Sequence, residues 1–120
     1  MEFKRLGDCD YKFMQIVWDN EPVNSGRLVE LCTQQLGWKK STTYTTIKKM
    51  AEKGLLRNEK ATVVSLVPRE QVQKEESDYF VNRTFGGSLP QFIAAFLGGR
   101  TISAKEAEEI QRMIEEHKEG

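Results

Sequence analysis

The sequence has few of the residues that catalysis and metal binding usually require. Its 120 residues include one histidine, His117, and two cysteines, Cys9 and Cys32. We find no Ser/His/Asp set, no catalytic carboxylate pair and no phosphate-binding loop, and the cysteines lack the spacing of metal ligands. We therefore predict no enzyme, no metal site and no cofactor. We expect Cys9 and Cys32 to be free thiols, buried or half-buried, in a reducing cytosol.

Long apolar runs are also missing. No stretch approaches the roughly 20 apolar residues that a membrane helix needs, and the N-terminal segment has no apolar signal core. With 30% charged and 38% hydrophobic residues, the composition is that of a soluble globular protein, which we expect in the cytoplasm. The length suits one compact domain, or one small domain with an oligomerisation arm.

The net charge is zero, but the charges are unevenly distributed. Residues 1–67 contain 11 Lys or Arg against 8 Asp or Glu, whereas residues 68–120 contain 7 against 10. The positive excess is strongest between Lys39 and Lys60, where seven basic residues stand against two glutamates. The two parts are therefore expected to do different work.

The first part predicts helices and then a short ribbon. A helix is expected from Asp8 or Asp10 to about Asp19, and Asn24 or Ser25 caps a second that runs to about Gln35. Gly37 ends that helix. The apolar positions of these two helices are Tyr11, Met14, Val17, Trp18, Leu28, Leu31, Cys32 and Leu36.

A third, basic helix follows at once. Ser41 or Thr42 can cap it, since a hydroxyl accepts an unpaired N–H of the first turn, and Gly54 ends it. Its inward positions at helical spacing are Thr43, Ile47, Met50, Ala51 and Gly54.

Two β-prone runs come next, Leu55–Arg57 and Thr62–Val67, around the turn Asn58–Ala61. Pro68 closes the second run, because proline has no N–H for a central strand. Helix, helix, basic helix and ribbon form, in that order, a winged helix-turn-helix over residues 1–68. The fold class is thus mainly α with a small β-hairpin wing.

The outward face of the basic helix and the ribbon beside it predict a surface for duplex DNA. Tyr44, Thr45 and Lys48 are expected at base edges, and basic side chains around them at phosphates. A merely solvated helix face is the alternative for this stretch alone. The predicted DNA-binding residues are Lys39, Lys40, Ser41, Thr42, Tyr44, Thr45, Lys48, Lys49, Arg57 and Lys60.

The second part, residues 69–120, predicts three more helices. They cover Arg69 to about Phe85, Ser88–Leu97, and a last helix to about His117 that opens with the capping box Ser103–Glu106. About 50 residues are too few for an independent core, so their apolar side chains are expected to meet the same helices of a second chain. These dimerisation residues are Phe80, Phe85, Leu89, Phe92, Ile93, Phe96, Leu97, Ile110, Met113 and Ile114.

Three groups of residues together carry a family likeness over essentially the whole chain. They are Asp10–Trp18, the pattern Trp38…Ser41-Thr42…Thr45…Lys53-Gly54-Leu55, and Gly86-Gly87 before an apolar helix and a capped acidic one. In order and spacing they resemble the penicillinase and methicillin-resistance repressors, the BlaI/MecI type of winged-helix regulators.

The resemblance implies a cytoplasmic homodimeric transcriptional repressor that binds a palindromic operator. It places Thr42, Tyr44, Thr45 and Lys48 on the operator-reading helix face. Family members are inactivated by proteolysis at an Asn-Phe bond in the apolar helix, downstream of a membrane β-lactam sensor. The matching bond here is Ala95-Phe96, which keeps the Phe and lacks the Asn; a sensor-linked protease is therefore an implied partner.

Two alternatives belong to other classes. A winged-helix module that binds protein would show little salt dependence. A small-molecule-sensing regulator would need a pocket, for which the apolar C-terminal helices are the candidate.

Overall fold

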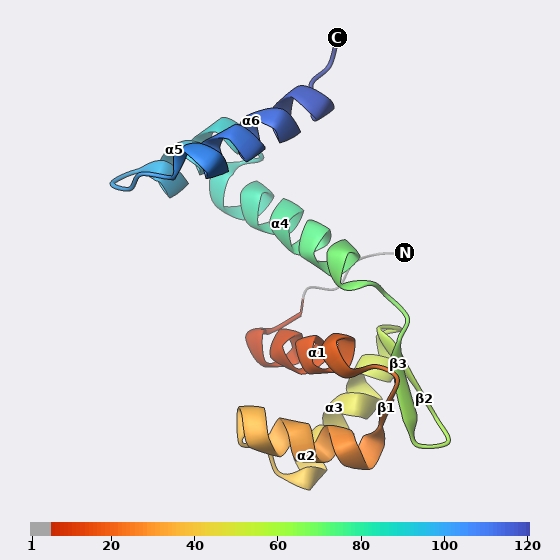
Figure 1. Cartoon of the computed structure of the whole chain (residues 1–120). Helices are drawn as coiled ribbons and strands as arrows, with labels where there is room; N and C mark the ends of the chain where they lie inside the picture. The colour runs from red at the N-terminus through yellow and green to blue at the C-terminus, as the bar shows by residue number, and fades with distance from the viewer. Residues whose placement is uncertain (1–5) are drawn as a thin grey trace. The chain divides into compact units, whose positions relative to one another are not determined.

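The computed structural model describes residues 6–120. The chain forms two compact units, one ending at Tyr79 and one beginning at Phe80. Figure 1 shows the elements in chain order. They are α1 (Asp8–Asn20), β1 (Val23–Asn24), α2 (Ser25–Leu36), α3 (Lys40–Glu52), β2 (Leu56–Glu59), β3 (Thr62–Ser65), α4 (Arg69–Phe85), α5 (Leu89–Leu97) and α6 (Ala104–His117).

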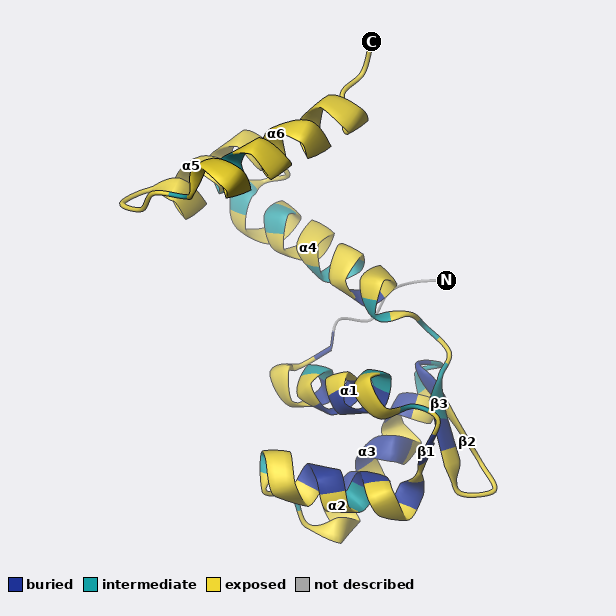
Figure 2. Cartoon of the chain, in the orientation of Figure 1, coloured by how far each residue is buried: buried dark blue, intermediate teal, exposed yellow. Residues whose placement is uncertain are grey.

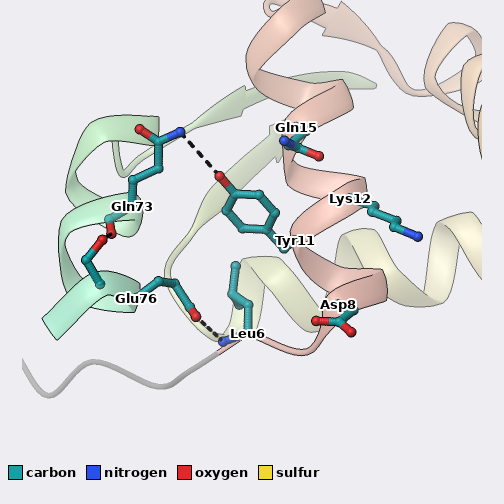
Figure 3. Close-up of a pocket in the computed structure, with 8 residues that line it drawn as sticks. Leu6, Asp8, Tyr11, Lys12, Gln15, Gln73 and Glu76 are labelled. Carbon is teal, nitrogen blue, oxygen red and sulfur yellow. Dashed lines mark hydrogen bonds between the residues drawn. The ribbon is translucent and has the colours of Figure 1, made fainter. Parts of the chain in front are cut away.

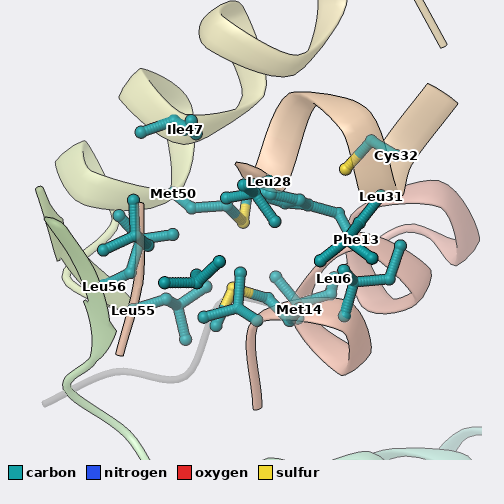
Figure 4. Packing of buried hydrophobic residues seen from close by; sticks show 14 of the residues in the cluster. Leu6, Phe13, Met14, Leu28, Leu31, Cys32, Ile47, Met50, Leu55 and Leu56 are labelled. Carbon is teal, nitrogen blue, oxygen red and sulfur yellow. The ribbon is translucent and has the colours of Figure 1, made fainter. Parts of the chain in front are cut away.

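The core of the first unit lies where α1, α2 and α3 meet the small sheet (Figures 2 and 4). Each helix contributes residues three and four apart, which is the spacing of one helical face. Removing such side chains from water is the main stabilising term of a unit of this size. The buried apolar residues are Leu6, Phe13, Met14, Ile16, Val17, Val23, Leu28, Leu31, Cys32, Ile47, Met50, Leu55, Leu56, Val63 and Val72.

The cysteines differ in environment. Cys32 is buried in this core, whereas Cys9 is exposed, so the prediction that both are at least half-buried is wrong for Cys9. Cys9 lies one position off the buried stripe of α1, which runs through Asp10, Phe13 and Met14. Burial raises the pKa of the Cys32 thiol, and the Thr43 hydroxyl opposes the shift.

The predicted end signals hold for α2 and fail at the start of α3. Asn24 caps α2 by accepting the Gly26 N–H at 2.8 Å, and Gly37 ends it with φ 69°. Neither Ser41 nor Thr42 caps α3, however; the N-cap is Lys39, and its side chain makes no capping bond.

The early start of α3 has a tertiary cause. The Trp38 N–H donates to the Cys32 carbonyl at 3.3 Å, and the Trp38 carbonyl accepts the Thr33 hydroxyl at 2.9 Å. The Trp38 ring packs on Phe13, with ring centroids 5.9 Å apart. The end of α2 therefore sets the turn, and the chain becomes helical directly after Lys39.

The buried face of α3 is also rotated slightly from the prediction. Thr43, Thr46, Ile47 and Met50 are buried, whereas Ala51 is exposed. The observed set has the i, i+3, i+4, i+7 spacing of a single stripe. Ala51 would lie beside that stripe rather than on it.

The sheet has three strands in the order β1-β3-β2, all pairs antiparallel. The predicted two-stranded ribbon missed β1, whose Val23 pairs with Val63. The expected four-residue turn is shorter as well, because Glu59 still pairs with Thr62. Only Lys60 and Ala61 form the turn, and their φ angles of 50° and 60° match a two-residue type I′ hairpin.

The first turn of α4 is attached to α1. The Trp18 indole N–H donates to the Val67 carbonyl at 3.0 Å, and the Arg69 guanidinium lies 5.6 Å from the Trp18 ring. Arg69 also forms an ion pair with Asp19. The hydrogen bond that the Arg69 guanidinium donates to Asp19 raises the pKa of this guanidinium.

The second unit contains the end of α4 with α5 and α6, at the bounds predicted for them. Ser88 and Ser103 cap α5 and α6 by accepting the N–H groups of Gln91 and Glu106. Phe80, Phe85 and Phe92 make edge contacts with one another. No residue of α5 or α6 is buried, as the colours of Figure 2 show.

Candidate nucleic-acid interface

The outward face of α3 brings the predicted recognition residues together. Successive residues of a helix turn by about 100°, so the side chains opposite the buried stripe are Ser41, Thr45, Lys48 and Glu52. Ser41, Thr42, Tyr44, Thr45, Lys48 and Lys49 are all exposed. The buried side chains of Thr43, Ile47 and Met50 lie on the opposite side of α3 and so keep this face outward. The arrangement presents hydroxyls, a phenol and an ammonium on one rigid surface.

Glu52 is the residue that the sequence interpretation overlooked on this face. It is exposed and lies one turn beyond Lys48, near the end of α3. Glu52 follows Lys48 by four residues, and residues four apart lie on the same face of a helix, so the sequence could have predicted its position. The acidic group makes the C-terminal end of the face less favourable for phosphates than its N-terminal end.

The N-terminal end of α3 is the positive end of the surface. Lys39 and Lys40 are exposed there, and no acidic residue lies in the first turn. The unpaired backbone N–H groups and the helix dipole add to the positive potential. The Lys40 ammonium lies 6.0 Å from the centroid of the Tyr44 ring, so these two side chains are neighbours on the surface.

Lys49 is placed differently from the other predicted lysines. Its ammonium lies 2.8 Å from Asp10 Oδ2, and the ammonium of Lys53 lies 4.0 Å from the same oxygen. Asp10 comes from the first turn of α1 and is buried. Nothing in the local sequence connects Asp10 with α3, so the sequence analysis did not predict this ion pair.

The wing presents the other basic candidates. Arg57 is exposed on β2, with its Nε 3.7 Å from Glu59 Oε1, and Lys60 is exposed in the turn. Two contacts hold the wing to the helices. The Ser25 N–H donates to the Ala61 carbonyl at 2.8 Å, and the Glu21 carboxylate accepts both the N–H and the hydroxyl of Ser65 at 2.8 Å.

A cavity of about 680 Å³ lies between the N-terminal half of α1 and the first half of α4 in the first unit. The Gln73 amide donates to the Tyr11 hydroxyl at 3.4 Å, and the Leu6 N–H donates to Glu76 at 3.3 Å (Figure 3). The lining is mixed in charge, so it does not define a ligand class. Its residues are Leu6, Asp8, Tyr11, Lys12, Gln15, Gln73, Glu76 and Ser77.

The predicted dimerisation residues form the apolar surface of the second unit. Leu89 and Ile114 are each 58% exposed and Met113 is 56% exposed, whereas Phe85 and Phe92 are half-buried. The other exposed members are Phe80, Ile93, Phe96, Leu97 and Ile110. Such exposure is unusual for large apolar side chains gathered on short helices.

The Ala95-Phe96 bond lies inside α5, and both residues are exposed. The Arg100 guanidinium stacks on the Phe96 ring at 4.4 Å. Gly98 and Gly99 follow the helix directly, and Gly99 has φ 75°. The bond is therefore close to a point where the chain leaves helical geometry.

Residues 6–120 lack two kinds of feature. No helix there is long and apolar enough to cross a membrane. No group of three or more His, Cys, Asp or Glu side chains in the same range is arranged to hold a metal ion.

The sequence is similar to those of known repressors. The family model described as "Penicillinase repressor" matches residues 6–116. A penicillinase repressor of Bacillus licheniformis is 25% identical over 121 aligned residues, covering 95% of this chain and 92% of that protein. An uncharacterized 16.5 kDa protein in the ptsI 3′ region of Latilactobacillus sakei is 26% identical over 109 residues, covering 88% and 75%.

A solved structure supports the fold. The solution structure of Bacillus licheniformis BlaI, in monomeric form with the blaP half-operator, superposes with a TM-score of 0.50 at 15% identity. The match covers 57% of this chain and 89% of that one. At this identity the likeness establishes a common fold, the winged helix-turn-helix expected for the first unit.

Proposed function

The chain belongs to the penicillinase repressor family, whose model spans residues 6–116; it is a DNA-binding transcriptional repressor, and we propose that two copies bind a palindromic operator. The family description names a repressor rather than an enzyme. We propose the cytoplasm as its compartment, since that is where operator DNA is bound. Residues 1–68 would bind DNA and residues 69–120 would form the dimer.

One observation carries this proposal for the binding surface: the exposed, basic face of α3 on a winged-helix scaffold. In helix-turn-helix proteins the N-terminal part of such a helix contacts bases in the major groove. Thr45 and Lys48 would reach base edges, where Thr contacts a thymine methyl and Lys a guanine acceptor. Ser41, Thr42 and Tyr44 would contact bases or the sugar-phosphate backbone beside them.

Phosphate contacts would supply most of the affinity. Lys39 and Lys40 stand at the positive end of α3, and Arg57 and Lys60 stand on the wing, all four exposed. Each neutralised phosphate releases counterions, which makes binding weaken as salt increases. Four such contacts in each of two protomers predict a slope of log K against log salt of about −7, at roughly −0.9 per contact.

The apolar surface of the second unit supports the dimer. No residue of α5 or α6 is fully buried within the unit, and a helical segment of about 40 residues rarely forms a stable core alone. Burial against the same helices of a second chain would remove Leu89, Ile93 and Ile114 from water. A two-fold axis would then present two α3 helices to half-sites about 34 Å apart.

We propose that repression ends when a sensor-linked protease cuts α5 at or near Ala95-Phe96. Both residues are exposed, and the helix end at Gly98 lies close by. Cleavage would remove α6 from the dimer surface and so separate the two half-site contacts. Since the Asn of the family's bond is replaced by Ala95, incubation with an Asn-Phe-cutting family protease tests this step, and an intact chain would argue against it.

The test of operator binding is an anisotropy titration of the full chain against promoter DNA upstream of its own gene, at two salt concentrations. The repressor predicts tight, salt-sensitive binding with two protomers per site. A winged-helix module for protein partners predicts no salt slope on any duplex, and that outcome would overturn the proposal. A small-molecule-sensing regulator would bind the duplex in the same way and release it only when its ligand is added.

A further inference from the structure

We propose that Asp10 is a positioning residue for DNA recognition, which holds Lys49 away from phosphates and so limits binding to non-operator DNA. The inference rests on the DNA binding proposed above. It concerns a residue of α1, outside the recognition helix, and it assigns Lys49 a different role from its neighbour Lys48.

The geometry of the contact is specific. Asp10 Oδ2 receives the Lys49 ammonium at 2.8 Å, the distance of a strong charge-assisted hydrogen bond. The side chain of Asp10 is 13% exposed, whereas that of Lys49 is 51% exposed. The carboxylate is therefore largely enclosed by the protein, and the lysine is the partner that solvent and DNA can reach.

Lys53 strengthens the arrangement. Its ammonium lies 4.0 Å from the same oxygen and its side chain is 25% exposed. Positions 49 and 53 are one turn apart, so both lysines leave α3 on the side that faces α1. A single buried carboxylate thus forms ion pairs with two lysines at the C-terminal end of α3.

The other lysines of α3, and Lys39 at its N-cap, have no such partner. Within residues 6–120, Lys39, Lys40 and Lys48 make no ion pair with an acidic side chain. Their ammonium groups are available to phosphates or bases, whereas Lys49 would first have to leave Asp10. A partly buried pair is screened by salt less than an exposed one, so the contact persists at the ionic strength of the cell.

The consequence is a limit on sequence-independent affinity. A freed Lys49 would add a phosphate contact on any duplex, operator or not, and phosphate contacts carry no sequence information. Asp10 also ties the first turn of α1 to α3 and so holds the angle at which α3 meets DNA. Loss of the carboxylate should therefore raise non-operator binding more than operator binding.

The experiment compares the full-length wild type with Asp10→Asn, Lys49→Gln, the double variant and, as a matched control, Lys40→Gln, which replaces an exposed lysine of α3 that is proposed to contact a phosphate. Anisotropy titrations use the promoter duplex and a scrambled duplex of equal length, over a range of salt concentrations. In Asp10→Asn we expect the salt slope on the scrambled duplex to steepen by about 0.9 for each lysine that reaches a phosphate. Adding Lys49→Gln should return it toward the wild-type slope.

Lys49→Gln alone should leave the wild-type slope unchanged, whereas Lys40→Gln, which removes a proposed phosphate contact, should reduce it by about 0.9 for each bound protomer. A folded Asp10→Asn protein with an unchanged slope would overturn the inference. If circular dichroism shows that Asp10→Asn does not fold, a slope loss of about 0.9 for each bound protomer in Lys49→Gln would overturn the inference instead. If the wild type shows no DNA binding at all, the proposed function fails, which is a separate result.

Discussion

Replacing Ala61 by Gly should stabilise the protein, although such a change usually does the reverse. Lys60 and Ala61 form the wing turn with φ angles of 50° and 60°. A residue with a Cβ pays about 1 kcal/mol or more in this left-handed region, whereas glycine adopts it freely. Glycine also gives the unfolded chain more freedom, which offsets about 0.5–1 kcal/mol.

The net gain expected for Ala61→Gly is roughly 0.5–1 kcal/mol, since type I′ turns strongly favour Gly at this second position. For a domain of this size that corresponds to a rise in melting temperature of about 2–6 °C. The Ser25 N–H bond to the Ala61 carbonyl uses only backbone atoms, so it survives the change. Lys60 also remains available for DNA.

The assay is thermal and urea denaturation followed by circular dichroism at fixed protein concentration. Ala51→Gly provides the matched control, because it is the same chemical change at an exposed position in α3. There glycine should destabilise by up to about 1 kcal/mol. If both variants lose stability equally, the left-handed turn and the strain assigned to it are wrong.

Three further predictions concern binding, assembly and the thiols. Lys48→Ala should weaken operator binding by about 1–3 kcal/mol, measured by anisotropy, and an unchanged affinity would remove Lys48 from the interface. Ile114→Glu should shift the protein from dimer to monomer in sedimentation velocity, because it places a charge on the apolar surface of α6. If the variant dimerises as strongly as the wild type, the dimer interface does not include Ile114. At pH 8, Cys9 should react with a thiol reagent in the native protein, and Cys32 only on unfolding. Burial raises the pKa of the Cys32 thiol, so the folded state keeps this proton to a higher pH than the unfolded chain does. The free energy of unfolding should therefore fall as pH rises above about 8.5. If the difference in free energy of unfolding between wild type and Cys32→Ala does not change with pH, this prediction is wrong.

Local signals predicted the helices well because their ends are determined locally. Asn24, Gly37 and Ser103 stop or start helices through their own side chain or backbone freedom. The helical period alone predicted which side chains of α3 are exposed. These features need no knowledge of distant residues, and the structure places them as expected.

Three features that the sequence analysis missed depend on contacts between residues far apart in the chain. The start of α3 is set by Trp38 on Phe13, and β1 exists only because Val23 meets Val63. The Asp10–Lys49 pair joins positions 39 residues apart. No periodicity or capping pattern within a short window could have revealed them.

The lack of buried residues in α5 and α6 has a consequence for gene control. In the proposed dimer, the order of these helices depends on assembly, so their stability follows mass action. Dilution then favours separate chains, and each tenfold change in the dimerisation equilibrium corresponds to about 1.4 kcal/mol. Below the dimerisation constant, operator occupancy rises with the square of chain number. A modest fall in the number of intact chains in the cell would therefore be enough to switch the regulated genes on.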